Sequence, residues 1–164
     1  MRKLKDLNEL KIISQDLKRK GKRIGIISGC FEIIHADFIR LFRFAKKHVD
    51  ILVIGLNSDR NVKLAKGDNR PVFNFLQRTK VLSELGTVDY IFKIEDIIEI
   101  SPEEINRIYR KIYLAVKPDY IITNGKVDKY LADKKRAIEG SDIKILKISN
   151  NKQPILIDKI IGGR

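Results

Sequence analysis

The stretch Gly29-Cys30-Phe31-Glu32-Ile33-Ile34-His35-Ala36-Asp37-Phe38 decides the fold, because it joins an apolar run to a helical repeat. The run at 23–28 has the composition of a buried parallel strand. From the last residue of the stretch onward, apolar residues recur at helical spacing: Phe38, Leu41, Phe42 and Ala45. His35 therefore stands at the opening of a helix, where free N–H groups and the helix dipole favour an anion. The stretch predicts a phosphate-binding turn.

Composition narrows the class of protein. The 164 residues carry a formal net charge of +13 and a single cysteine, Cys30. This length fits one domain with its own core. The charge indicates an anionic partner such as a nucleotide, a sugar phosphate, a nucleic acid or an anionic membrane. One cysteine excludes an intrachain disulfide and a cysteine zinc cluster, and the lack of a visible signal or membrane span predicts a cytoplasmic location.

Helix and strand patterns alternate along the chain, which is typical of a parallel sheet covered by helices. The expected strands are 23–28, 51–56, 90–94, 120–123 and 143–148. The expected helices are an amphipathic one with Leu4, Leu7, Leu10 and Leu17, then 36–48, 75–85, 101–116, 129–139 and 154–161. We predict an α/β fold: a Rossmann-like, doubly wound, five-stranded parallel sheet in a single domain. Its parts are an N-terminal helix at 1–20 and a core at 23–164.

A series of short motifs resembles that of the nucleotidyltransferases with a His-x-Gly-His signature, the cytidylyltransferase-like superfamily. The motifs are the Gly29–His35 turn, Asn57-Ser58-Asp59, Lys66-Gly67, Arg70-Pro71 and Val88-Asp89. Their combination is most similar to the heptose-phosphate (sugar-phosphate) adenylyltransferase branch. The resemblance implies transfer of a nucleoside monophosphate from ATP or CTP to a small phosphorylated sugar or alcohol. Pyrophosphate leaves, Mg²⁺ accompanies the triphosphate, and no covalent enzyme intermediate forms.

The resemblance also implies a set of site residues. His35, Lys46 and Arg78 are the expected catalytic residues, although Lys46 and Arg78 also suit exposed helix charges. The expected nucleotide- and phosphate-binding residues are Gly29, Cys30, Phe31, Asn57, Asp59, Lys66, Arg70, Asn124, Gly125, Ser149, Asn150 and Asn151. Related enzymes are often dimers, and the amphipathic first helix would suit a homodimer interface.

Two positions depart from the signature. His-x-Gly-His corresponds here to His35-Ala36-Asp37-Phe38, so a carboxylate replaces the glycine and an apolar ring replaces the second histidine. Loss of one transition-state donor typically lowers a rate by about 100- to 1000-fold. Both residues also suit ordinary helix stability, since Asp is favoured in a first turn and Phe38 starts the apolar stripe. Alternatively, Asp37 fills the anion site itself, or it binds Mg²⁺ and recruits the triphosphate.

Three functions follow from these observations. The first is an active nucleotidyltransferase, supported by the ordered motifs. The second is a catalytically degenerate homologue that binds a nucleotide or a protein, supported by Asp37, Phe38 and an eroded closing motif at Ser149. The third is nucleic-acid binding through the basic surface. It is disfavoured because no aromatic residues accompany the basic cluster at 18–23.

Overall fold

A computed structural model describes residues 2–124 and 128–148. Its five-stranded sheet has the order β3-β2-β1-β4-β5, and all four pairings are parallel. The strands are β1 (Ile24–Gly29), β2 (Ile51–Asn57), β3 (Tyr90–Ile94), β4 (Tyr120–Thr123) and β5 (Lys144–Lys147). The helices are α1 (Leu7–Arg19), α2 (Ala36–Lys46), α3 (Asp59–Lys66), α4 (Phe75–Glu84), α5 (Pro102–Val116) and α6 (Leu131–Ala137). The predicted doubly wound α/β fold is confirmed.

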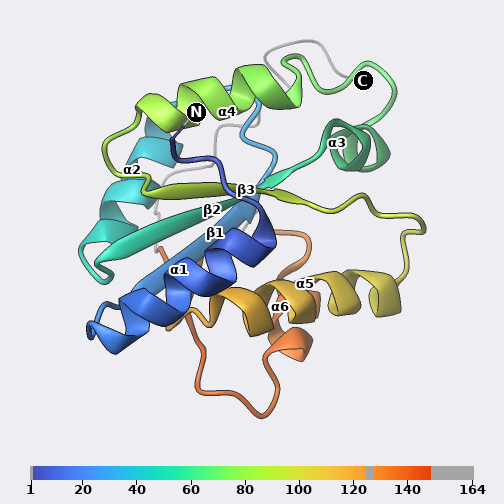
Figure 1. The fold of residues 1–164 in the computed structure, drawn as a ribbon. Helices are drawn as coiled ribbons and strands as arrows, with labels where there is room; N and C mark the ends of the chain where they lie inside the picture. Colours follow the sequence, from blue (N-terminus) through green and yellow to red (C-terminus); the bar gives the residue numbers. More distant parts are fainter. Residues whose placement is uncertain (1, 125–127, 149–164) are drawn as a thin grey trace.

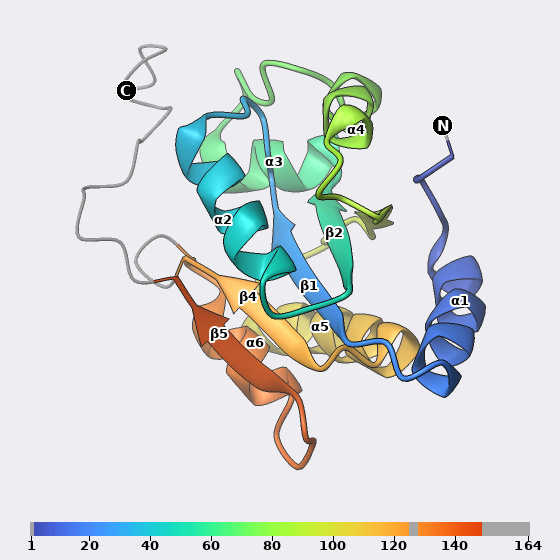
Figure 2. The same cartoon turned by 90° about the vertical axis from the view of Figure 1, so that its left-hand side faces the viewer.

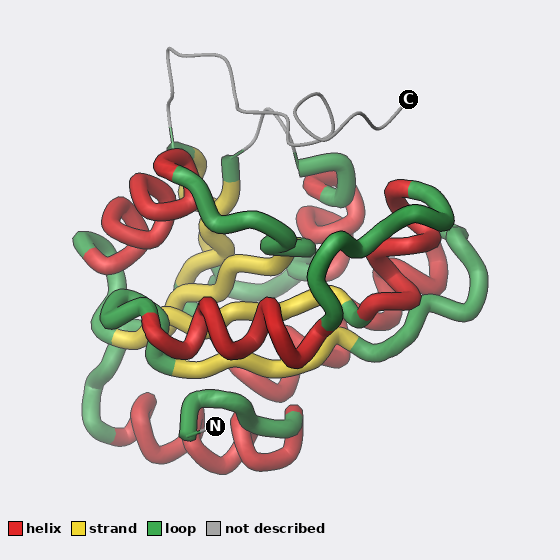
Figure 3. Tube along the Cα trace, turned by 90° about the horizontal axis from the view of Figure 1, so that it is seen from above, coloured by secondary structure: helices red, strands yellow, loops and turns green. Residues whose placement is uncertain are grey.

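Helices cover both faces of the sheet (Figure 1). One core cluster joins α1, α5 and α6 to side chains such as Ile26 and Phe92, and the other joins α2 and α4 to Ile27 and Ile54. Ile26 and Ile27 point to opposite faces because side chains alternate along a strand. From above, the strands lie in the middle of the molecule with helices around them (Figure 3). Both faces of the inner strands are thus buried, which explains why β1 and β2 read as continuous apolar runs.

The chain begins differently from the prediction. Asp6 caps α1, since its side chain accepts the Glu9 N–H while the Glu9 side chain accepts the Asp6 N–H. Leu4 precedes this cap and forms a parallel bridge with Ile91 of β3, so it extends the sheet and is not helical. The apolar face of α1 packs against α5 within the chain. The same chain therefore already covers the face that we predicted for a homodimer interface.

A second difference is α3, a helix in a segment expected to be a loop. Ser58 caps it by accepting the Asn61 N–H at 3.1 Å. Only a short apolar stripe marks this helix, since Val62 is its one buried apolar residue. The expected terminal helix at 154–161 lies outside the described residues. Within the described part of the chain, no helix has both the length and the apolar character needed to cross a membrane.

β1 and β4 separate at the carboxyl edge of the sheet. β1 pairs with β2 along its whole length, from Ile24 to Gly29. It pairs with β4 only through Gly25 and Ile26. The chain order reverses between these two strands. β2 and β3 lie on one side of β1 (Figure 1), and β4 and β5 lie on the other (Figure 2). Ligands of open α/β sheets bind at such a switch point.

Candidate active site

A cleft of about 400 Å³ opens between the diverging ends of β1 and β4. The β1 side contributes the turn from Ile27 to Ile33 with His35, Asp37 and Phe38. The β4 side contributes Thr123 and Asn124, followed by Asp128, Lys129, Tyr130 and Lys134. Asn57, the last residue of β2, and Lys66, the last residue of α3, complete the rim. Most of the predicted phosphate-binding residues within the described part of the chain thus meet in one place.

The turn after β1 is sharply bent. Phe31 is buried and has a φ of 47°, a left-handed conformation that is rare for a bulky residue. Its ring lies against Gly29, where an added Cβ would come within 3.1 Å of the ring. The Phe31 conformation redirects the chain from the strand toward α2, and Gly29 leaves space for the ring. These two predicted residues shape the turn through backbone and packing.

His35 is the N-cap of α2. Its Nδ1 accepts the backbone N–H of Asp37 at 3.3 Å. Partial burial lowers the pKa of His35 from its ordinary value of 6.5, and the nearby Arg40 guanidinium lowers it further. The ring is therefore neutral at pH 7. Because Nδ1 accepts a hydrogen bond, the ring proton resides on Nε2, which leaves one N–H donor for a ligand.

The two departures from the signature follow on α2. Asp37 is buried and forms an ion pair with Arg40 one turn further along the helix. The Phe38 ring packs against His35 with centroids 4.4 Å apart and against Phe31 at 5.1 Å. Phe38 thus belongs to the aromatic packing of the turn and offers no polar group to the cleft. Phe38 therefore contributes packing at the position where the His-x-Gly-His signature has a hydrogen-bond donor.

Glu32 holds the loop after α3 in place. Its side chain is 1% exposed and binds Lys66 Nζ at 2.9 Å and Arg70 Nη1 at 3.1 Å. It also accepts the Val72 N–H at 3.1 Å. Lys66 remains 27% exposed and lines the cleft, whereas the Arg70 side chain is 6% exposed. Lys66 therefore presents part of its side chain to the cleft, and Arg70 fixes the loop from within.

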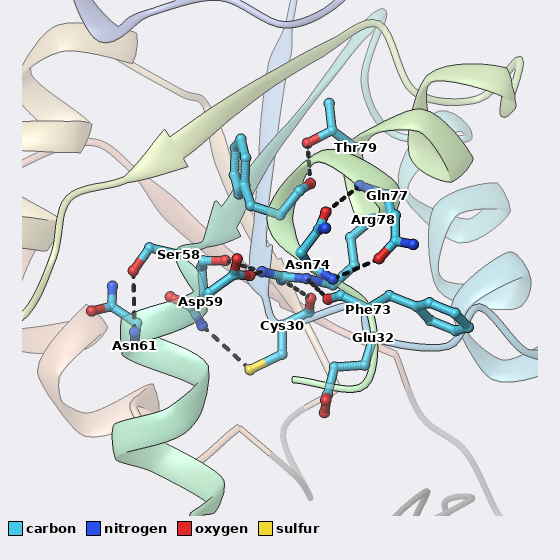
Figure 4. Close-up of polar contacts among 12 residues, drawn as sticks. Cys30, Glu32, Ser58, Asp59, Asn61, Phe73, Asn74, Gln77, Arg78 and Thr79 are labelled. Atoms are coloured by element: carbon cyan, nitrogen blue, oxygen red, sulfur yellow. Dashed lines mark hydrogen bonds and ion pairs between the residues drawn. The ribbon is translucent and has the colours of Figure 1, made fainter. Parts of the chain in front are cut away.

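Arg78 is buried and connects four segments (Figure 4). Its guanidinium donates to the carbonyls of Cys30, Asn57 and Phe73 and to Asp59 Oδ1 at 2.7 Å. These partners follow β1, end β2, precede α4 and begin α3. The alternative that Arg78 is an exposed helix charge is wrong, because its side chain is 0% exposed. It acts on the site as a positioning residue, and Asp59 is its ionic partner.

Lys46 lies at the opposite edge of the sheet from the cleft. Its Nζ donates to the Asp50 carbonyl at 2.6 Å and to Asp89 Oδ2 at 2.9 Å, just before β2 and β3 begin. An 11-residue helix is about 16 Å long, so α2 carries its last residue away from the turn that starts it. Lys46 is therefore not among the residues that line the cleft, and the structure gives its predicted catalytic role no support.

Several cleft residues were not predicted. Thr123 Oγ1 and Lys134 Nζ each bind Asp128 Oδ2 at 2.6 Å, and Tyr109 and Tyr130 lie beside them. The sequence carries a signal for Lys134, because Tyr130, Lys134 and Ala137 share the buried face of α6 at i, i+4 and i+7. A charge on such a face requires a buried partner.

Other predicted residues have modest or undescribed places. The Asn57 amide donates to Cys30 Sγ at 3.6 Å and so joins the ends of β1 and β2. Asn124 lies at the cleft rim directly after β4. The predicted contacts of Gly125, Ser149, Asn150 and Asn151 lie outside the described residues.

A metal site made by protein side chains alone is absent from the described residues, which hold no group of three or more metal-binding side chains. The cleft carboxylates are each matched by a cation: Glu32 by Lys66, Asp37 by Arg40, and Asp128 by Lys134. A metal ion that enters with a triphosphate would take most of its ligands from phosphate oxygens and water. Asp37 lines the cleft but is paired with Arg40, so its role as a metal ligand stays a prediction.

Known proteins share this fold. A cytidylyltransferase-like family model matches residues 26–155. The chain belongs to the cytidylyltransferase-like family. Within that family it is 37% identical over 140 residues to the bifunctional protein HldE of a Nitratiruptor species. The match covers 85% of this chain and 27% of HldE, so the chain spans about a quarter of that relative.

Solved structures agree with this cytidylyltransferase-like assignment. A lipopolysaccharide core biosynthesis protein from Thermoplasma volcanium superposes with a TM-score of 0.61 at 25% identity, covering 80% of this chain and all of that one. A bifunctional NMN adenylyltransferase/ADP ribose pyrophosphatase from Francisella tularensis, complexed with AMP and a manganese ion, has a TM-score of 0.56 at 15% identity. That match covers 80% of this chain and 38% of the other and shows the shared fold. None of these similarities supports the catalytically degenerate alternative.

Proposed function

We propose that this cytidylyltransferase-like chain moves a nucleoside monophosphate from ATP or CTP to a small phosphorylated sugar or alcohol. An oxygen of the acceptor phosphate forms a bond to the α-phosphorus. The bond from that phosphorus to the bridging oxygen breaks, and pyrophosphate leaves with the electron pair. The acceptor phosphate is already ionised at neutral pH, so the step needs no protein base. It needs positioning and stabilisation of negative charge.

The observation that carries this proposal is His35 in the cleft at the start of α2. Its neutral ring keeps a proton on Nε2, and the start of α2 adds the positive end of a helix dipole. Lys66, at the rim, adds a cation. These groups suit a phosphorus centre that gathers negative charge in the transition state.

The finer features of the substrates rest on the relatives. HldE and the Thermoplasma lipopolysaccharide core protein support a sugar-phosphate acceptor, and the motif combination favours ATP. The manganese and AMP in the Francisella enzyme support a divalent metal, which we propose is Mg²⁺. When bound, this metal neutralises phosphate charge. Asp37 would hold it only after exchanging its bond to Arg40. A homodimer and the domain limits 1–20 and 23–164 likewise remain predictions.

The test is pyrophosphate release from a panel of nucleoside triphosphates and sugar phosphates with Mg²⁺. We expect the native chain to release pyrophosphate with at least one pair. His35→Ala should lower kcat by about 100-fold because one donor to the reacting phosphate is lost. The chain offers a matched control in His48, just beyond the other end of α2, whose Nδ1 contacts the Phe44 carbonyl. His48→Ala should leave kcat unchanged.

A further variant separates an active enzyme from a degenerate homologue. Phe38→His restores the second histidine of the signature and should raise kcat, whereas Phe38→Leu should not. Turnover by Phe38→His together with none by the native chain would refute the proposed function and establish the non-catalytic reading. Turnover by neither, with nucleotide binding retained, would also refute it.

A further inference from the structure

A buried lysine, Lys134, lies on the β4 side of the cleft. The function proposed above assigns roles to the turn between β1 and α2 and none to this lysine. The Lys134 side chain is 3% exposed, and its Nζ is 2.6 Å from Asp128 Oδ2 and 5.4 Å from the centre of the Tyr109 ring. Burial lowers the pKa of Lys134, while the Asp128 carboxylate acts in the opposite direction. Lysine is rarely fully buried in proteins. An ion pair alone is a weak explanation for a buried lysine, because replacing a buried ion pair by apolar residues of similar size is often neutral or stabilising.

Asp128 is already occupied by protein donors. Its Oδ2 accepts both Lys134 Nζ and Thr123 Oγ1, each at 2.6 Å, and its Oδ1 accepts the Tyr130 N–H at 3.2 Å. Lys134 is not saturated in the same way. In the part of the chain that the structure describes, Asp128 is the one hydrogen-bond partner of Lys134 Nζ, which can donate three bonds. Two N–H donors thus remain on a buried cation that lines the cleft.

A second lysine stands at the mouth of the same cleft. Lys129 is exposed, and its Nζ lies 5.0 Å from the centre of the Tyr130 ring. It reaches the Ala65 carbonyl near the end of α3 at 3.4 Å, a long contact across the mouth. Within residues 2–124 and 128–148, Lys129 has no carboxylate partner. It therefore provides a cation whose present contact is weak enough for an anion to replace.

We propose that Lys134 and Lys129 bind a phosphate group of the substrate from the β4 side of the cleft, with Asp128 and Thr123 positioning Lys134. The inference rests on the proposed function and adds a second phosphate contact to it. His35 and the start of α2 hold one side of the cleft, and the two lysines hold the other. Phosphate contacts on both sides of the cleft suit a ligand with more than one phosphate group, or two ligands that each carry one. The shared chemistry is a phosphate dianion, and its source is either the triphosphate or the acceptor.

The test measures binding by calorimetry of three probes: ATP with Mg²⁺, inorganic pyrophosphate, and glucose 1-phosphate. Lys129→Ala is the first variant, because an exposed change of this kind has little effect on folding. The second is Asp128→Asn with Lys134→Gln, which replaces the ion pair with a neutral pair and leaves no unpaired buried charge. Lys135→Ala is the matched control, since Lys135 is an exposed neighbour on α6 that does not line the cleft.

We expect each cleft variant to weaken binding of at least one probe by about 10-fold, because each loses a charge-assisted hydrogen bond. Weaker ATP and pyrophosphate binding assigns the lysines to the triphosphate. Weaker glucose 1-phosphate binding assigns them to the acceptor. The inference is overturned if both variants bind all probes within 2-fold of the native chain, if Lys135→Ala weakens binding equally, or if the native chain binds no probe. Failure of the proposed function is distinct: the native chain binds phosphates but releases no pyrophosphate.

Discussion

At the residue scale, Arg78 shows how a buried charge organises a site that it does not enter. Replacing it by Met leaves Asp59 and three carbonyl groups without their donor. We expect Arg78→Met to lower the free energy of unfolding by about 3 to 5 kcal/mol, because three backbone carbonyls lose their donor and each group left unsatisfied costs about 1 to 3 kcal/mol. Urea denaturation measures this. Lys80→Met, an exposed change on the same helix, should stay within about 0.5 kcal/mol of the native value.

His35 links the same scale to pH. Its pKa is lowered in the folded state, so near pH 6 the unfolded chain binds more protons than the folded one. The neutral His35 ring therefore makes its full contribution to the free energy of unfolding above the ordinary pKa of 6.5. This contribution is lost as the pH falls below that value. Protonation also removes the Nδ1 acceptor from the Asp37 N–H. The control is His35→Asn, whose amide caps a helix without titrating. As the pH is lowered from about 8 to about 5, we expect urea unfolding to show that the native protein loses stability relative to this variant. A stability difference that stays constant over this range would show that His35 does not cause the pH dependence.

At the element scale, the start of α2 combines the positive end of a helix dipole with the carboxylate of Asp37. We expect Asp37→Asn to strengthen binding of ATP with Mg²⁺ several-fold, because the change removes a negative charge and releases Arg40 from its ion pair. Calorimetry measures the affinity, and Asp68→Asn, at an exposed carboxylate paired with Lys63, is the control. Weaker binding by Asp37→Asn would instead identify Asp37 as a metal ligand.

The elements also show what the sequence could predict. β3 and β4 have the predicted bounds, because a buried parallel strand leaves a short, unbroken apolar run between turn residues. α3 was missed because its amphipathic signal is short and one buried apolar residue marks it. Lys46 and Arg78 were placed by motif position, but their roles depend on distances across the fold. The length of α2 carries Lys46 away from the cleft, and Arg78 reaches carbonyls that no local pattern reveals.

At the scale of the whole molecule, the charge of +13 requires a test that separates nucleotide binding from general attraction to polyanions. A ligand at 100 times its Kd stabilises a folded protein by about 2.7 kcal/mol. For a chain of this size we expect ATP with Mg²⁺ to raise Tm by about 5 to 10 °C. This shift should persist between about 50 and 200 mM salt, whereas any shift caused by duplex DNA should disappear over that range. A shift with DNA alone would favour the nucleic-acid alternative.

The short pairing of β1 with β4 has a consequence for how this protein can change. The main chains part after Ile26 and Ile121, so backbone geometry sets the width of the cleft and side chains only line it. A substitution in the lining therefore changes which ligand the cleft prefers, while the backbone keeps the cleft open. This is why the fold can carry Phe38 where the signature has its second histidine. The same freedom makes this cleft a suitable starting point for directed evolution toward new phosphate-bearing substrates.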